Sequence, residues 1–104
     1  MFTIAKTEAT RGIWSKTQQR PSGPSRDMVM VDVIAAGICG TDHHIYNWDS
    51  WSAGRVKTPM VIGHEFVGAI SAVGEGVTGY AIGDRVSAEC HVACGKCHFC
   101  RTGN

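Results

Sequence analysis

Three cysteines near the end of the chain have the spacing of metal ligands. Cys94, Cys97 and Cys100 form a C-x2-C-x2-C pattern. Thiolates at this spacing can surround one soft cation, and zinc takes four such ligands in a closed tetrahedral site. Part of a ferredoxin run has the same spacing, but that run needs a fourth cysteine followed by proline, and the sequence after Cys100 supplies neither. We therefore expect a zinc site whose fourth ligand is Cys90, His91 or a residue beyond the printed chain.

A second group of side chains combines a thiol, a hydroxyl, two imidazoles and a carboxylate. Cys39, Thr41 and His44 form a C-x-T-x-x-H pattern, and His64 and Glu65 follow about one strand later. Cysteine, histidine and glutamate around an open position are typical of a catalytic zinc site. A threonine hydroxyl can pass on a proton, and histidine is the side chain best suited to accept it near neutral pH. On spacing alone, a surface histidine whose hydrogen bonds are satisfied is an equal alternative for His44.

Two further patterns resemble well-known motifs but lack their context. Residues 74–79 read G-x-G-x-x-G, the spacing of a dinucleotide-binding loop, which must lead from a strand into a helix. Here another turn follows at Gly83 and then a strand-like segment, so we expect a hairpin connection. His64 and Glu65 would begin an H-E-x-x-H zinc-protease motif only if position 68 were histidine, and it is glycine. Neither pattern therefore indicates a function of its own.

The bulk composition allows one globular domain and excludes several kinds of partner. The 104 residues are 43% hydrophobic and 18% charged, with a formal net charge of +1. Such a near-neutral chain gives no support for a nucleic-acid or membrane partner, which would require a clustered basic face. No apolar run reaches the roughly 20 residues of a membrane span, and residues 1–6 lack the apolar core of a signal peptide. Clustered cysteines without an export signal indicate metal ligands in a reducing compartment, so we expect a cytoplasmic protein.

Short apolar runs separated by 13 glycines predict strands and turns rather than long helices. The polar segment 1–27 is expected to contain no more than a short edge strand. Thr41 is expected to cap a single helical turn, and the tail from Cys90 onward is expected to be a loop. Short strands joined by glycine turns are typical of a small barrel or sandwich. The predicted strands are residues 12–14, 28–34, 60–62, 66–73 and 85–89.

Taken in order, these motifs resemble those of the medium-chain zinc-dependent alcohol dehydrogenases. Residues 44–49 (HIYNWD), Trp51 and residues 59–61 (PMV) resemble the L-threonine-oxidising branch of that family. The resemblance is dense from about residue 35 onward and thin before it. The family motifs are residues 37–42 (GICGTD), 63–65 (GHE), 67–68 (VG), 83–86 (GDRV) and the cysteines at 94, 97 and 100.

The resemblance implies a mainly β fold, a GroES-like β-barrel domain with short helical turns. Residues 1–104 would form the N-terminal zinc-binding catalytic domain, truncated within its structural-zinc lobe and lacking the Rossmann domain that binds NAD. A catalytic zinc would be held by Cys39, His64 and Glu65. The proton of the substrate hydroxyl would pass through Thr41 to His44. The ligands implied for the structural zinc are Cys94, Cys97 and Cys100.

The implied activity is NAD-linked oxidation of a small-molecule secondary alcohol, with L-threonine as the expected substrate at its 3-hydroxyl. A homo-oligomer, by family resemblance a tetramer, is expected for the full-length enzyme. Two alternatives remain: a polyol or other alcohol dehydrogenase, or a non-catalytic zinc-binding structural module. Two departures from the family stand out, because its fourth structural cysteine would fall beyond the chain and Cys90 occupies a position where a small residue is expected. His91 stands where members of the L-threonine-oxidising branch also carry a histidine.

Overall fold

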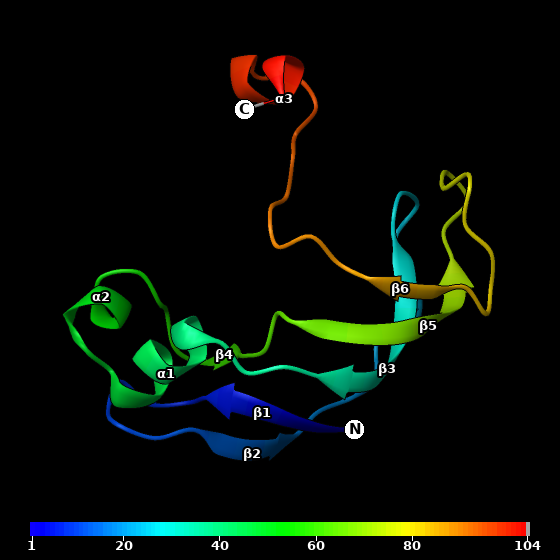
Figure 1. Cartoon of the computed structure of the whole chain (residues 1–104). Coiled ribbons are helices and arrows are strands. Elements are labelled where there is room, and N and C mark those ends of the chain that lie inside the picture. The colour runs from blue at the N-terminus through cyan, green and yellow to red at the C-terminus, as the bar shows by residue number, and fades with distance from the viewer. Residues whose placement is uncertain (104) are drawn as a thin grey trace.

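The computed structural model describes residues 1–103, which form six strands and three short helices. The strands pair in two three-stranded antiparallel sheets, ordered β2-β1-β4 and β3-β5-β6. The prediction of a mainly β chain with short helical segments is confirmed. The elements are β1 (Phe2–Lys6), β2 (Trp14–Thr17), β3 (Val29–Ala36), α1 (Gly40–Asn47), α2 (Ser50–Ala53), β4 (Met60–Val61), β5 (Phe66–Val73), β6 (Arg85–Ser87) and α3 (His98–Thr102) (Figure 1).

The first sheet corrects two expectations about the polar N-terminal segment. β1 is a full strand and the centre of its sheet, although only an edge strand was expected there. The edge strand itself, β2, begins at Trp14 rather than covering residues 12–14. The prediction was wrong because segment 1–27 is polar overall and β1 buries only its last two residues, Ala5 and Lys6. Pairing on both edges stabilises a strand that buries little of its own apolar surface.

Lys6 ties the first sheet to the helical end of the molecule. Its side chain is completely buried, and its ammonium donates to the carbonyl of Gly12 at 2.7 Å and contacts the carbonyl of Thr10. The same ammonium lies 5.5 Å from the ring centre of Trp14 and 4.9 Å from that of Trp48. Carbonyl oxygens and aromatic faces thus replace water around a buried cation.

The second sheet is built on the antiparallel pairing of β3 with β5. The predicted strand 66–73 matches β5, whereas the strand predicted at 28–34 extends to Ala36. A Cβ atom at Gly68 would lie 2.5 Å from the carbonyl oxygen of Asp32, so only glycine allows the two strands this close. β6 pairs antiparallel with β5, and residues 74–84, which begin with the glycine loop 74–79, join these two strands. The hairpin interpretation of the glycine loop is therefore confirmed.

The C-terminal tail corrects one more expectation. It was predicted to be a loop, but it contains the short helix α3. An extended segment leads from β6 to α3 and carries it away from both sheets, at the top of Figure 1. Residues 98–102 thus form a separate lobe, set apart from the sheets and from α1 and α2, rather than an additional layer on a sheet.

Little of the apolar surface is buried. Among the described residues the buried hydrophobic side chains are Ala5, Ile45 and Ile70, while Ile34 and Ile38 are 65% and 88% exposed. The radius of gyration is 15.9 Å, larger than the roughly 13 Å of a compact domain of this length. The two sheets and the lobe therefore leave broad apolar faces open.

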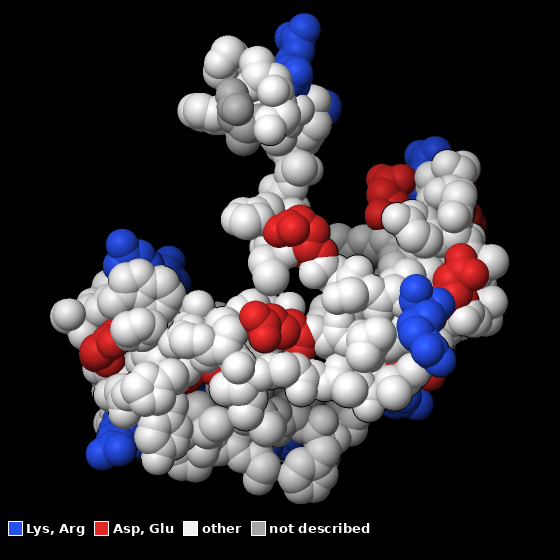
Figure 2. Space-filling model, in the orientation of Figure 1, with Lys and Arg blue, Asp and Glu red and all other residues white. Residues whose placement is uncertain are grey.

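The surface carries no dominant charge on the visible face. Figure 2 shows lysine and arginine side chains dispersed among aspartate and glutamate side chains over this face. No helix within residues 1–103 has the length and hydropathy to cross a membrane.

Candidate metal centres

The register of the second sheet brings the first candidate site together. Ala36 ends β3 and pairs with Phe66, the first residue of β5. Because the strands are antiparallel, the residues that leave β3 lie beside those that enter β5. The backbone N–H of Gly37 extends this pairing by donating to the carbonyl of Glu65 at 2.8 Å. Cys39 and His64, 25 positions apart in sequence, consequently meet at one end of the sheet.

Cys39 begins the helix α1 as its N-cap. Its sulfur accepts a hydrogen bond from the backbone N–H of Thr41 at 3.3 Å. The carboxylate of Asp42 accepts from the backbone N–H of Cys39 at 3.0 Å, which completes a capping box. The prediction that Thr41 caps this helix is therefore wrong, and α1 extends over eight residues rather than a single turn. The sulfur is held in place by backbone donors before any metal is considered.

Three ligand atoms converge at this point. The Sγ atom of Cys39 lies 3.0 Å from the Nε2 atom of His64. With a carboxylate oxygen of Glu65, these atoms all lie within 4.8 Å of one another. Ligands at about 2.3 Å (sulfur) and about 2.0–2.1 Å (nitrogen) from a tetrahedral zinc are roughly 3.6 Å apart. The donor set suits zinc, and a small outward movement of sulfur and nitrogen would admit the ion.

Asp42 lies behind the histidine of this cluster, a position that sequence reasoning missed. Its Oδ1 atom faces the Nδ1 atom of His64 at 3.9 Å. Asp42 is buried, and this Oδ1 atom has no hydrogen-bond partner among the described residues. A carboxylate behind the second nitrogen of a ligating histidine orients the ring and fixes its tautomer. The only sequence signal was an acidic residue in the first helical turn, which suits many helices.

The two residues predicted to relay a proton both lie on α1. Thr41 and His44 are three positions apart and so share one face of the helix. His44 is about half exposed, and its Nδ1 atom is hydrogen-bonded to the carboxylate of Asp49. The ring of Trp51 lies 5.6 Å from that of His44. This pairing and packing are compatible with both interpretations of His44, a relay group and a hydrogen-bonded surface histidine.

Asp49 was not singled out from the sequence. Its carboxylate has two partners, His44 at one oxygen and the backbone N–H of Ser52 at the other, at 3.0 Å. The hydrogen bond from His44 is the main reason why the pKa of Asp49 lies below its ordinary value, and the bond from Ser52 lowers this pKa further. The only signal in the sequence was an aspartate in a position typical of a helix N-cap, which does not indicate a contact with His44.

The C-terminal lobe holds the second candidate site. The sulfur of Cys100 lies 3.7 Å from that of Cys94 and 3.4 Å from that of Cys97. Two thiolates on one tetrahedral zinc are about 3.8 Å apart, and a disulfide would need about 2.05 Å. Backbone N–H groups of Lys96 and Cys97 lower the pKa of Cys94 to about 7. This spacing and this pKa both favour thiolates gathered for a metal.

The remaining cysteine and histidine of the tail lie elsewhere. The lobe cluster consists, within the described part of the chain, of three cysteines and does not include Cys90 or His91. The thiol of Cys90 lies 3.9 Å from the carbonyl oxygen of His64, so it adjoins the first site. His91 is exposed and bonds to Glu89 at 2.6 Å. Neither therefore acts as a fourth ligand of the lobe in this arrangement.

The fold is mainly β, and it carries a cysteine–histidine–glutamate cluster and a separate three-cysteine lobe. This combination defines a class of zinc-binding protein, and known protein families contain a match to it. Residues 25–104 match the family described as alcohol dehydrogenase GroES-like domain. The chain belongs to this family, and the GroES-like fold class expected from the motifs is confirmed.

The chain is also similar to individual enzymes and to solved structures. The chain is 47% identical over 103 residues to the L-threonine 3-dehydrogenase of Pseudoalteromonas atlantica, a match that covers 99% of this chain and 30% of that enzyme. An alcohol dehydrogenase structure from Thermus sp. ATN1 matches with 36% identity and a TM-score of 0.81, covering 98% of this chain and 28% of the other. A zinc dependent alcohol dehydrogenase structure from Streptococcus pneumonia matches with 29% identity and a TM-score of 0.83, covering 99% and 28%. The chain thus spans less than a third of the length of these relatives.

Proposed function

We propose that this chain supplies the metal-binding and proton-relay part of a zinc-dependent, NAD-linked dehydrogenase that oxidises L-threonine at its 3-hydroxyl. The observation that carries the proposal is the convergence of Cys39, His64 and Glu65 beside a helix that bears Thr41 and His44. The similarity to an L-threonine 3-dehydrogenase supports the choice of substrate. The activity is that of the whole protein, in the cytoplasm and as a homo-oligomer.

The first cluster would hold the catalytic metal through Cys39, His64 and Glu65. All three are at least partly exposed, so a substrate oxygen can approach from the open side. When bound there, zinc supplies Lewis-acid chemistry that lowers the pKa of a hydroxyl group. The lobe cysteines, Cys94, Cys97 and Cys100, would hold a structural zinc with a fourth ligand from outside the described residues.

The chain's own contribution to the chemistry is the movement of one proton. The hydroxyl of Thr41, near the N-terminus of α1, would accept the proton of the substrate hydroxyl and donate its own towards His44. His44 would release the proton to solvent, which its half-exposed side chain permits. A positioned proton-transfer group of this kind contributes about 10² to 10⁴ in rate.

Hydride transfer would take place outside these residues. The loop 74–79 joins two strands, so it has no helix N-terminus to hold a pyrophosphate. The dinucleotide would be bound by a Rossmann domain of the full-length enzyme, and the hydride chemistry belongs to the NAD cofactor. Residues 1–104 would correspondingly be the N-terminal GroES-like domain.

Cobalt substitution tests the proposal on the metal centres themselves. Cobalt reports its ligands by visible absorption, so one site with a single thiolate and one with three should give two different spectra. Cys39→Ser should remove the first spectrum only, and Cys97→Ser the second only. Turnover of L-threonine, compared with polyols and simple alcohols, then tests the substrate in the whole protein. A single all-thiolate site without turnover would instead indicate a structural zinc module.

A further inference from the structure

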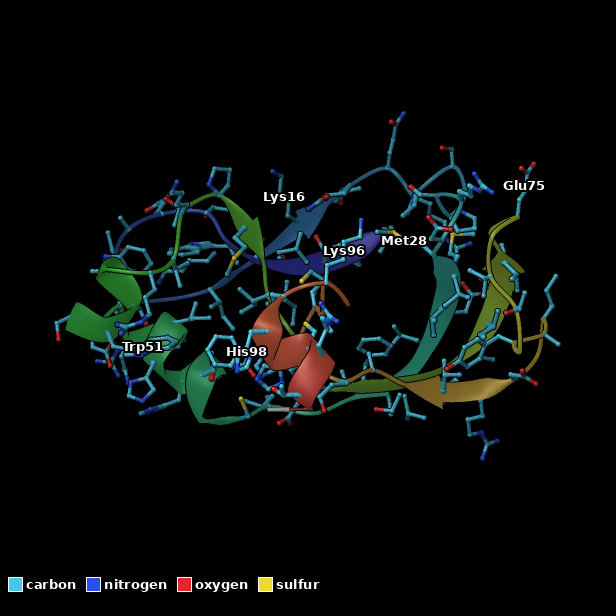
Figure 3. All side chains as sticks on the ribbon, turned by 90° about the horizontal axis from the view of Figure 1, so that it is seen from above. Lys16, Met28, Trp51, Glu75, Lys96 and His98 are labelled. Carbon is cyan, nitrogen blue, oxygen red and sulfur yellow. The ribbon has the colours of Figure 1, made fainter. Side chains whose placement is uncertain are left out.

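The junction between α1 and α2 places a carboxylate directly against His44. Trp48 ends α1 in the left-handed conformation, with φ of 54°, so the chain reverses there. Asp49 follows at once, and its Oδ2 atom meets the Nδ1 atom of His44. In the view of Figure 3, Trp51 marks this helical end of the molecule, whereas Glu75 marks the opposite end.

Asp49 is itself held in one orientation. Its Oδ1 atom accepts the backbone N–H of Ser52 at 3.0 Å and so caps α2, while the other oxygen faces His44. The side chain of Ser52 is completely buried, which anchors this turn. The carboxylate therefore cannot rotate away from His44 without losing the cap of α2.

We propose that Asp49 is a positioning residue for His44, which it keeps in the tautomer that carries its proton on Nδ1. A carboxylate only accepts hydrogen bonds, so a neutral imidazole beside it must donate from Nδ1. The Nε2 atom then keeps its lone pair and is the atom that accepts the proton. The consequence for catalysis rests on the proposed function, whereas the tautomer itself does not.

The proton balance follows from this arrangement. The substrate hydroxyl loses its proton to the oxygen of Thr41, and the hydroxyl proton of Thr41 moves to Nε2 of His44. The ring then holds protons on both nitrogens and carries a positive charge, which the carboxylate of Asp49 stabilises. Release of the Nε2 proton to water restores the starting tautomer, and the Nδ1 proton never leaves.

The other groups around His44 offer no second acceptor. The ring of His43 lies 6.4 Å away, and the ring of Trp51 lies 5.6 Å away. The guanidinium of Arg55 lies over the ring of Trp51, 5.2 Å from the ring centre, and as a cation it cannot accept a hydrogen bond. Among the groups recorded around this imidazole in residues 1–103, Asp49 is thus the acceptor that can select its tautomer.

The tautomer is tested by long-range ¹H–¹⁵N spectra of the histidine rings in the zinc-loaded 104-residue chain, at a pH where His44 is neutral. The His44 signals are assigned by their loss in His44→Gln. We expect the Nδ1–H form in the parent chain. In Asp49→Asn the amide oxygen can still cap α2, but the amide N–H₂ now donates to Nδ1, so the proton should move to Nε2. Asp84→Asn, which alters a comparable carboxylate-to-backbone bond in the distant β5–β6 turn, should leave the His44 tautomer unchanged.

Asp49→Ser separates the two duties of this residue, because serine can cap α2 without offering His44 a carboxylate. We expect a mixture of both tautomers in this variant, with α2 intact. The proposal would be overturned if His44 of the parent chain were already in the Nε2–H form. It would also be overturned if the His44 signals of both Asp49 variants were the same as those of the parent.

Kinetics of the whole protein test the consequence. Asp49→Asn should lower kcat by about 10² to 10⁴, the range of a lost proton-transfer group, with little change in the KM for NAD. Asp49→Glu, which restores a carboxylate, should recover part of this loss. If the tautomer shifts as expected but the parent protein oxidises no alcohol, the proposed function fails and the positioning of His44 stands. If the parent is active and Asp49→Asn retains its full kcat across pH, the positioning role in catalysis is refuted.

Discussion

Gly37 and Glu65 are in contact. Gly37 follows the end of β3, and Glu65 precedes the start of β5. The backbone N–H of Gly37 donates to the carbonyl of Glu65, and a Cβ atom at Gly37 would lie 2.8 Å from the Oε2 atom of Glu65. Position 37 therefore takes part in the backbone pairing, and the absence of a Cβ atom there gives the carboxylate of the first metal cluster its place.

This contact predicts that Gly37→Ala disturbs the metal site more than the fold. The added methyl group meets the end of a flexible side chain rather than backbone, so Glu65 can move aside. We expect a small change in the free energy of unfolding and at least a tenfold weaker affinity for cobalt at the Cys39 site, as metal titration would measure. Gly23→Ala is the matched control, since a Cβ there meets nothing within 4 Å. Equal cobalt affinity in both variants would contradict the prediction.

The isolated chain should bind fewer than two equivalents of zinc and lose them readily to a chelator. Each cluster provides three ligands within residues 1–103, and the lobe is largely exposed. Binding free energy at a structural zinc site is also folding free energy, so α3 and the loop before it should order on metal addition. Metal analysis after dialysis, together with hydrogen exchange of the lobe, measures this. Two zinc ions retained through dialysis against a strong chelator would disprove it.

His44→Ala in the whole protein should slow turnover by about 10² to 10⁴ while the zinc content stays the same. The imidazole is hydrogen-bonded to Asp49 and belongs to neither metal cluster, so its loss leaves the described ligand atoms in place. His43→Ala is a fair comparison, because that histidine is the adjacent, exposed position of the same helix. Steady-state rates across pH and metal analysis test both variants, and unchanged rates for His44→Ala would exclude the relay.

The pair formed by Asp49 and His44 should make stability depend on acid pH. The hydrogen bond from His44 holds the pKa of Asp49 below its ordinary value of 3.8. A carboxyl group with a lowered pKa in the folded state contributes stability above its unfolded pKa and loses it as the pH falls through the folded pKa. Asp49→Asn should therefore be less stable than the parent at pH 6, and the difference should close in acid below about pH 3.8.

Urea unfolding at several pH values measures this dependence. In a His44→Ala background the effect of Asp49→Asn should shrink, because the main cause of the lowered pKa is gone. An equal effect in both backgrounds would assign the stabilisation to the cap of α2 instead.

The 104-residue chain should bind no NAD and oxidise no L-threonine by itself. Hydride transfer requires the donor carbon and the nicotinamide to be held about 3 to 3.5 Å apart. The loop 74–79 joins two strands and cannot position a dinucleotide. Calorimetric titration with NAD, and an assay for NADH at several chain concentrations with Cys39→Ser as the control, test this. Micromolar binding of NAD would place the nucleotide site within these residues.

The sequence by itself determined the chemistry that this chain can offer. The side chains at 39, 64 and 65 and the three lobe cysteines were predicted as metal ligands from their types and spacings, and each set lies together in the structure. The relay role of Thr41 and His44 stays a prediction, because their spacing also suits an ordinary helix surface. The strand 66–73 and the hairpin at residues 74–79 were also predictable, since β-branched residues bounded by glycines are a local signal.

Only the tertiary structure decided which of these residues meet. The contact between Cys39 and His64 depends on the register of β3 against β5, which is a long-range pairing. The strand β1 was not predicted, because it is stabilised by pairing on both edges more than by burial of its own side chains. Asp42 and Asp49 read as ordinary helix-end residues, and their second contacts, to His64 and His44, arise from the packing of chain segments. The residue type and its local spacing specify the chemistry that a side chain can perform. The fold decides which other side chain it meets, because it brings distant backbone segments together.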